Sequence, residues 1–221
     1  MIAVQPAFKK MTLLLVLAAL SQPVFAHAVN YALENAPIKD VAGFYTKMGF
    51  THILPYGLDH IVFVVALCLL NTKLKTIIWQ ATAFTLAHSI TLALSTKDLI
   101  QLPPQIVEPV IALSILFIAI ENIFFKELKF WRLLMVFLFG LIHGLGFAGV
   151  LNEIGLPPDR FYTSLLFFNV GVELGQIAII LVVYGLLIKP FGEARNYQKR
   201  IVYPLSFLIS AIAVYWVIER L

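Results

Sequence analysis

The chain has 221 residues, of which 61% are hydrophobic and only 13% are charged, and its mean hydropathy is +0.92. A soluble domain is about half apolar and about a quarter charged, so this composition excludes an ordinary soluble enzyme and indicates a multi-pass membrane protein. The formal net charge of +4 does not indicate nucleic acid as a partner, because the basic residues lie in short loops between apolar runs.

The first 26 residues have the pattern of a secretory signal peptide. Lys9 and Lys10 precede an apolar core at residues 11–20, and Val24 and Ala26 place small residues before a cleavage site. The pattern predicts cleavage after Ala26, and the alternative is an uncleaved anchor helix.

Cleavage would make His27 the first residue of the mature protein. A terminal amine beside an imidazole can bind a metal ion, so His27 is a candidate for capturing ions outside the membrane. The blander alternative is that its position is an accident of the cleavage site.

Residues 27–55 are predicted to be a periplasmic or interfacial segment. Apolar side chains recur at helical spacing within residues 38–50, which predicts a short helix on the outer leaflet or, alternatively, a loop. His52 follows and is predicted to be a solvated loop histidine. The apolar stripe consists of Val41, Phe44, Tyr45 and Met48.

The remainder, residues 56–221, reads as one transmembrane domain of six helices. Most of its apolar runs approach the length of about 20 residues that crosses the hydrocarbon core. The single cysteine, Cys68, lies within the first run and is expected to be a core or lipid-facing residue. The predicted spans are 56–71, 77–96, 106–125, 133–151, 162–188 and 202–219.

The loop charges predict the orientation. If the mature N-terminus lies outside, the inner loops hold nine Lys and Arg residues and the outer segments hold five. The positive-inside rule then predicts that the mature N-terminus and the C-terminus both lie on the outer side of the membrane.

Several ionisable and polar groups interrupt the predicted spans. A charged group in the bilayer core costs about 2.5–3.5 kcal/mol or more, so such groups usually face a cavity or a partner. Those closest to a common depth are His88, His143, Asn169 and Glu173, with Asp59 and His60 nearer the outer surface.

Imidazoles and carboxylates together suit nickel, zinc, iron or cobalt. His60, His88, His143 and Glu173 could supply four ligands, and Asp59 could be a fifth ligand or an acceptor that orients an imidazole. For each single histidine, a hydrogen-bonded packing role is the alternative.

Other polar residues are assigned to the lining of the site or the path. Asn169, Glu173 and Gln176 share one helix face. Glu121 and Asn122, near the inner end, are either a way-station for the ion or a structural polar clamp. Glu108 lies near the outer headgroups, where a solvated carboxylate is the simpler interpretation.

Two glycine pairs, Gly140 with Gly144 and Gly171 with Gly175, allow close helix packing. Each pair flanks a candidate ligand. The pattern therefore predicts that the fourth and fifth spans pack together and hold His143 near Glu173.

Several motifs, in the same order, resemble those of the HupE/UreJ family. The resemblance extends over about residues 44–190, and the second branch of the family is the closer one. The motifs are GLDH at 57–60, FTLAHSITL at 84–92, VE…IALS…EN at 107–122, FGLIHGLGFA at 139–148 and FNVGVELGQ at 168–176.

The resemblance implies a bacterial inner-membrane protein of the hydrogenase and urease accessory group that takes up nickel. It makes Asp59, His60, His88, His143 and Glu173 the candidate metal ligands. It makes the other polar residues within the spans a lining, namely Glu108, Glu121, Asn122, Asn169 and Gln176.

Three functions remain open at this point. The first is a secondary permease for a divalent transition metal, with nickel favoured over zinc, cobalt and iron. The second is an intramembrane zinc-type metalloenzyme, with Glu173 or Asp59 as general base, and the third is a non-transporting accessory protein. The sequence leaves open whether the protein forms a homo-oligomer.

Overall fold

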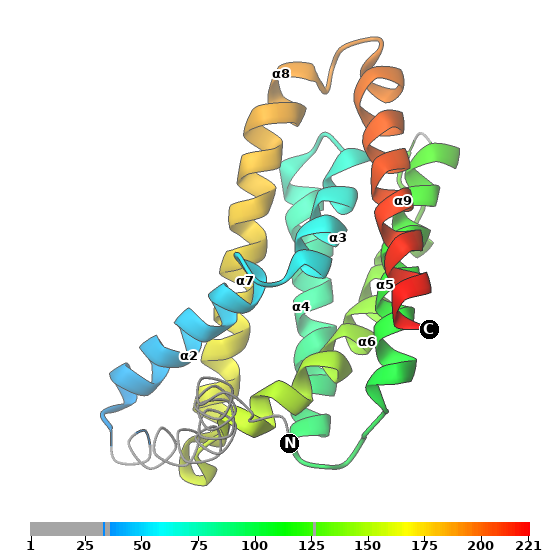
Figure 1. Ribbon diagram of the computed structural model, residues 1–221. Helices are drawn as coiled ribbons and strands as arrows, with labels where there is room; N and C mark the ends of the chain where they lie inside the picture. Colours follow the sequence, from blue (N-terminus) through cyan, green and yellow to red (C-terminus); the bar gives the residue numbers. More distant parts are fainter. Residues whose placement is uncertain (1–32, 34–35, 126) are drawn as a thin grey trace, which may run out of the picture.

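The computed structural model describes residues 33, 36–125 and 127–221, which form a bundle of helices (Figure 1). No strand occurs within these residues, so the predicted all-α class is confirmed for them. The predicted signal peptide, residues 1–26, and His27 lie outside the described residues. The helices are α2 (Ile38–Ile53), α3 (Leu58–Leu69), α4 (Leu74–Thr96), α5 (Pro104–Phe124), α6 (Trp131–Ile154), α7 (Phe161–Val183), α8 (Lys189–Phe191) and α9 (Tyr203–Arg220).

Five of the expected spans appear as helical segments that are long and apolar enough to cross a membrane. The first expected span, 56–71, differs from the expectation, because its helix α3 passes this test only together with α2, and the two helices are bent by 71° at a short break between them. The five segments are Leu74–Thr96, Pro104–Phe124, Trp131–Ile154, Pro158–Phe191 and Gln198–Arg220.

Helix α2 confirms the helix predicted within residues 38–50, rather than the alternative loop, and packs along α7. Its buried side is a continuous stripe along α7, and Figure 1 shows α2 running beside the lower part of that helix. A Cβ atom on Gly49 would collide with the carbonyl of Phe168, so only glycine allows this approach. The buried stripe is Val41, Tyr45, Gly49 and Ile53.

The contacts of α2 and α3 indicate that the two helices are successive halves of one crossing. Helix α2 follows α7 from its N-terminal end to its middle, and α3 then continues to the opposite end, where Tyr197 donates a hydrogen bond to the carbonyl of Leu69. The contacts of α2, in chain order, are Tyr45 with Gly155, Gly49 with Phe168 and Ile53 with Gly175.

The break between the two halves therefore lies inside the bundle. A Cβ atom on Gly57 would collide with the carbonyl of His52, so glycine allows the chain to turn this tightly. The turn places the end of α2 beside the start of α3.

The glycine pairs pack as closely as predicted, but the predicted partner helices are wrong. Gly140 and Gly144 press α6 against α4, where a Cβ atom on Gly144 would collide with the carbonyl of His88 and the hydroxyl of Thr91. Gly171 and Gly175 press α7 against α2 instead. The fourth and fifth spans thus have different partners.

Helix α3 lies at the centre of the apolar core. Val64 and Cys68 belong to one buried cluster, while Phe63, Ala66 and Leu67 belong to a second cluster on its other side. Cys68 is fully buried, as expected for a core residue.

Candidate metal centre

Four histidines from four helices converge beside the α2–α3 break. His60 is central, because its ring centroid lies 4.8 Å from that of His52, 5.2 Å from that of His143 and 6.0 Å from that of His88. The rings of His52 and His88 are 6.2 Å apart. We call these four residues the histidine cluster.

His52 is the member that sequence reasoning missed. It was expected to be a solvated loop residue, but it lies in the last turn of α2 with its Nε2 atom buried. The available signal was its position eight residues before His60, with Pro55 and Gly57 between them, since a tight turn brings the two histidines together.

The local sequence explains why the other members meet. The contact between Gly144 and the carbonyl of His88 holds the backbones of α6 and α4 together at the level of the cluster. His143 precedes that glycine, and His60 lies in the first turn of α3, immediately after the break. The predicted similarity in depth of His88 and His143 agrees with this arrangement.

The ring nitrogens show which atoms are available to bind an ion. His143 Nδ1 lies 2.8 Å from the carbonyl oxygen of Phe139. Because a carbonyl only accepts, Nδ1 carries the proton and Nε2 keeps its lone pair. Among the described residues, this Nε2 atom and the buried ring nitrogens of His52 (Nε2), His60 (Nε2) and His88 (Nδ1 and Nε2) have no hydrogen-bond partner.

Buried polar atoms without a partner are uncommon in native structures and call for a bound water, an ion or a functional role. Five such nitrogens in one cluster therefore point to a ligand of the histidine cluster. Neutral imidazole nitrogens are ligands for divalent transition metals.

The ring spacings fit such a site in part. With metal–nitrogen bonds of about 2.0–2.1 Å, imidazole centroids lie about 3 Å from the ion and neighbouring rings about 4.5–5.5 Å apart. The two shortest cluster separations fall in this range and the two longer ones do not. In the described part of the chain, no three His, Cys, Asp or Glu side chains are placed to hold a metal ion as they stand, so ion binding requires the rings to reorient.

Aromatic side chains surround the histidine cluster. The ring centroid of Phe147 lies 3.8 Å from that of His52, and the centroid of Phe84 lies 4.8 Å from that of His143. Such an apolar shell limits water and controls the polarity around a bound ion.

A cavity of about 510 Å³ leads to the cluster from the end of the bundle at which α9 ends, the end that the sequence predicts to be the outer one. Its lining includes three of the four histidines, His52, His60 and His143, together with Asp59 and Glu108. Glu108 is exposed, in agreement with a solvated carboxylate. Asp59 pairs with Arg220 at 3.0 Å and does not orient an imidazole.

The structure does not bring Glu173 into the histidine cluster. Its carboxylate accepts hydrogen bonds from the hydroxyls of Thr82 and Thr85, across the interface of α7 with α4. Gln176 Nε2 also donates to Thr85 Oγ1, at 2.8 Å. The expected proximity of His143 and Glu173 is therefore wrong, because their helices pack on different sides of α4.

Asn169 contributes to its own helix, since its Nδ2 atom donates to the carbonyl of Leu165 at 2.8 Å. Its Oδ1 atom is buried and has no partner among the described residues. Of the three residues predicted to share a face, Glu173 and Gln176 thus contact α4 rather than the cluster.

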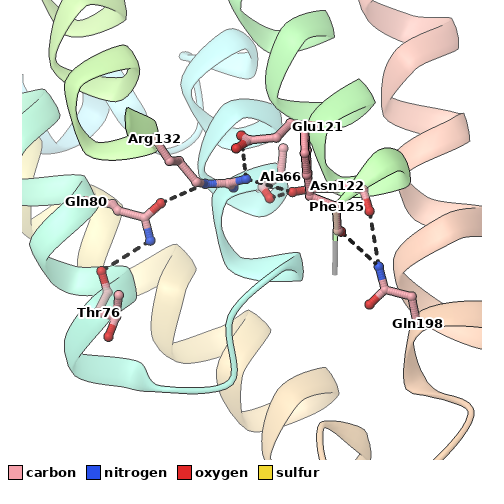
Figure 2. A network of polar contacts seen from close by, with 8 residues as sticks. All are labelled: Ala66, Thr76, Gln80, Glu121, Asn122, Phe125, Arg132 and Gln198. Carbon is pink, nitrogen blue, oxygen red and sulfur yellow. Dashed lines mark hydrogen bonds and ion pairs between the residues drawn. The ribbon is translucent and has the colours of Figure 1, made fainter. Parts of the chain in front are cut away.

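Glu121 and Asn122 belong to a buried polar clamp near the other end of the bundle (Figure 2). Arg132 is 1% exposed, and its Nη1 atom donates to Glu121 at 2.7 Å and to Asn122 at 3.1 Å. Its Nε atom donates to Gln80 at 2.9 Å, and Asn122 donates to the carbonyl of Ala66. These contacts favour the structural interpretation of Glu121 and Asn122.

Arg132 is one of the nine basic residues that the sequence assigns to the inner loops. It instead lies in the first turn of α6 and is buried. The clamp joins α3, α4, α5 and α6. A second cavity, of about 560 Å³, lies at this end and is lined by residues of the segments 70–76, 127–128 and 192–198.

Comparison with known proteins agrees with the arrangement of helices and motifs. The family model HupE_UreJ_2, described as HupE / UreJ protein, matches residues 28–220. Searches of curated proteins and of solved structures found no match. Since the family match extends over nearly the whole chain, including α2 and the histidine cluster, the chain belongs to the HupE/UreJ family.

Proposed function

We propose that this protein is a secondary permease that moves a divalent transition-metal ion, most favourably nickel, from the periplasm to the cytoplasm. The observation that carries the proposal is the histidine cluster, which gathers imidazoles from four helices at the break of a discontinuous span. Cobalt, zinc and iron are the other ions that this ligand chemistry suits.

Membrane transporters commonly place their ion sites at interrupted helices, where the backbone and side chains can rearrange. The break between α2 and α3 has this character, and it lies inside the bundle next to His52 and His60. An ion site made of rings that must reorient would bind reversibly, as transport requires.

The positions of the two cavities support the proposed direction of transport. The outer cavity is lined by His52, His60 and His143, whereas the described lining of the inner cavity contains none of the cluster residues. This arrangement corresponds to a site that is accessible from the outside and closed toward the inside.

The exit route in this proposal passes along α4 and α7. Thr85 is one helical turn from His88, and it contacts both Gln176 and Glu173. The oxygen atoms of Thr85, Gln176 and Glu173 extend the line of polar groups beyond the histidine cluster. The route past Glu121 and Asn122 is less favourable for a cation, since the buried guanidinium of Arg132 occupies it.

A second candidate function is an intramembrane zinc-type metalloenzyme. It is favoured by the gathering of the histidines at one outer cavity and by the engagement of Glu121 and Asn122 in a clamp. Asp59 would then be the general base, because Glu173 lies elsewhere. An open position for water on the ion would be required.

The test combines metal content with flux. The purified protein would be analysed for bound Ni, Co, Zn and Fe, and the same ions would be assayed in proteoliposomes. The variants His88→Ala and His143→Ala would be compared with wild type and with Ser210→Ala, which alters a polar residue of α9 outside the cluster.

Flux that is lost in both histidine variants but retained in Ser210→Ala would support the permease. Tight stoichiometric metal without flux would favour the enzyme. A folded sample that shows no bound metal and no flux would contradict both the permease and the enzyme. A non-transporting accessory role would then remain.

A further inference from the structure

Arg220 lines the outer cavity and links α9, on which it lies, to α3 and α5. It lies in the last turn of α9, and its Nη2 atom is 3.0 Å from Asp59 Oδ1, at the start of α3. Its Nη1 atom is 3.5 Å from the carbonyl oxygen of Glu108 on α5. Its guanidinium lies 5.2 Å from the ring centroid of Trp216.

The pair of Asp59 and Arg220 lies beside the route to the histidine cluster. Asp59 precedes His60 in the chain, and both residues line the same cavity as Arg220. An ion that enters the cluster from this cavity therefore passes a carboxylate that already has a positively charged partner.

The pair is suited to open. The side chains of Arg220 and Asp59 are 19% and 27% exposed, and ion pairs in contact with water are weak. A divalent ion carries twice the charge of a guanidinium and approaches a carboxylate oxygen to about 2.0–2.2 Å. It therefore attracts Asp59 more strongly than Arg220 does.

We propose that Arg220 is an exchangeable counter-ion for Asp59, which it releases when a divalent metal ion enters the outer cavity and recovers when the ion leaves. This inference rests on the proposed permease function and adds the residue that sets the affinity of its site. The guanidinium competes with the ion for one carboxylate, so it keeps binding weak enough for release. The ion pair between the end of α9 and α3 forms only when the ion is absent.

The test measures the dissociation constant of Ni²⁺ by equilibrium dialysis with protein in lipid nanodiscs. The proteins compared are wild type, Arg220→Gln, Arg220→Lys, Asp59→Asn, the double variant Asp59→Asn/Arg220→Gln and Arg160→Gln. The last variant removes a positive charge near the outer end of α7 and is the matched control.

Removing the competitor should tighten Ni²⁺ binding by Arg220→Gln about 1.4- to fivefold, the range expected for a partly solvated pair. Arg220→Lys and Arg160→Gln should bind as wild type does. In the Asp59→Asn background, Arg220→Gln should have no further effect, because the two residues act through one interaction.

Unchanged or weaker binding by a folded Arg220→Gln protein would overturn the exchange. So would an equal effect of Arg220→Gln with and without Asp59, since that would reflect general electrostatics. If the wild-type protein binds Ni²⁺ but the variants show neither tighter binding nor a dependence on Asp59, only the exchange proposal fails. If wild type binds no metal ion at all, the permease proposal fails with it.

A measurement on the wild-type protein avoids dependence on a variant that fails to fold. Hydrogen exchange of the last turn of α9 should become faster when Ni²⁺ binds, because Arg220 loses its contact with α3. Unchanged or slower exchange there, in a sample that binds Ni²⁺, would contradict the proposal.

Discussion

His52 completes the histidine cluster and lies on a helix that carries several polar residues. Its ring is within 6.2 Å of the rings of both His60 and His88, and Phe147 covers it. A residue in this position either binds the ion with the other imidazoles or packs beside a three-histidine site. The proposed function requires the first.

We therefore expect His52→Ala to weaken Ni²⁺ binding at least about tenfold, a loss comparable to that caused by altering the partners of metal ligands. The reduction should match that of His88→Ala. Thr51→Ala, in the same turn of α2, is the control, because among the described residues its hydroxyl donates only to the carbonyl of Met48. A dissociation constant of His52→Ala equal to that of wild type would exclude His52 from the site.

The sequence predicts the depth of a residue in the membrane but not the direction in which its helix faces. His88 and His143 were correctly placed at one level. Glu173 was expected to approach His143 for the same reason, yet it faces Thr82 and Thr85. His52 was missed because the polar residues of α2, with Pro55 and Gly57, resemble a loop before a span.

At the scale of the elements, the α4–α6 contact holds His88 and His143 in register. The hydroxyl of Thr91 on α4 donates to the carbonyl of Leu141 on α6 at 2.6 Å, and Gly144 allows the two backbones to meet. The glycine spacing predicted close packing. It could not predict the partner helix, because a small residue is compatible with any neighbour.

The variant Gly144→Ala should lower the stability of the protein by about 1–3 kcal/mol, because an added methyl group overpacks the interface. Gly149→Ala, in the same helix, should be neutral or slightly stabilising, since nothing lies within 4 Å of its added Cβ. Unfolding in SDS would measure both. Equal stability of the two variants would contradict the α4–α6 contact.

The polar clamp around Arg132 is the second contact between helices that stabilises the fold. Replacing Arg132 by methionine leaves Glu121 buried without its partner, and breaking a buried ion pair costs about 3–5 kcal/mol. The double variant Glu121→Met/Arg132→Met should recover most of this loss, because no uncompensated charge remains. If the double variant were as unstable as the single one, the ion pair would not be the source of the effect.

For the whole molecule, the bent α2–α3 pair, counted as one span, brings the number of candidate spans to six. The count of basic residues in the inner loops falls by one, because Arg132 is buried in α6. The remaining basic residues still favour the inner side for segments 72–76, 126–130 and 189–201. Hydropathy indicates the five long helices and the apolar run at 56–71. It does not predict that this run forms only the short helix α3, which follows α2 across a 71° bend.

The orientation gives a direct prediction. Cysteines introduced at Asp159 and at Asn196, both exposed, should respond differently to a membrane-impermeant thiol reagent in intact cells. Asp159→Cys should be labelled from outside and Asn196→Cys should not, while buried Cys68 gives no background. The reverse labelling pattern would show that the protein has the opposite orientation in the membrane. The proposed direction of transport would then also be reversed.

The central claim is that the four imidazoles of the histidine cluster bind one transported ion, and X-ray absorption of the Ni²⁺-loaded protein tests it most directly. The account predicts nitrogen or oxygen ligands at about 2.0–2.1 Å, with a strong imidazole contribution that decreases in His52→Ala, His60→Ala, His88→Ala and His143→Ala alike. A spectrum without imidazole, or one unchanged by these substitutions, would contradict it.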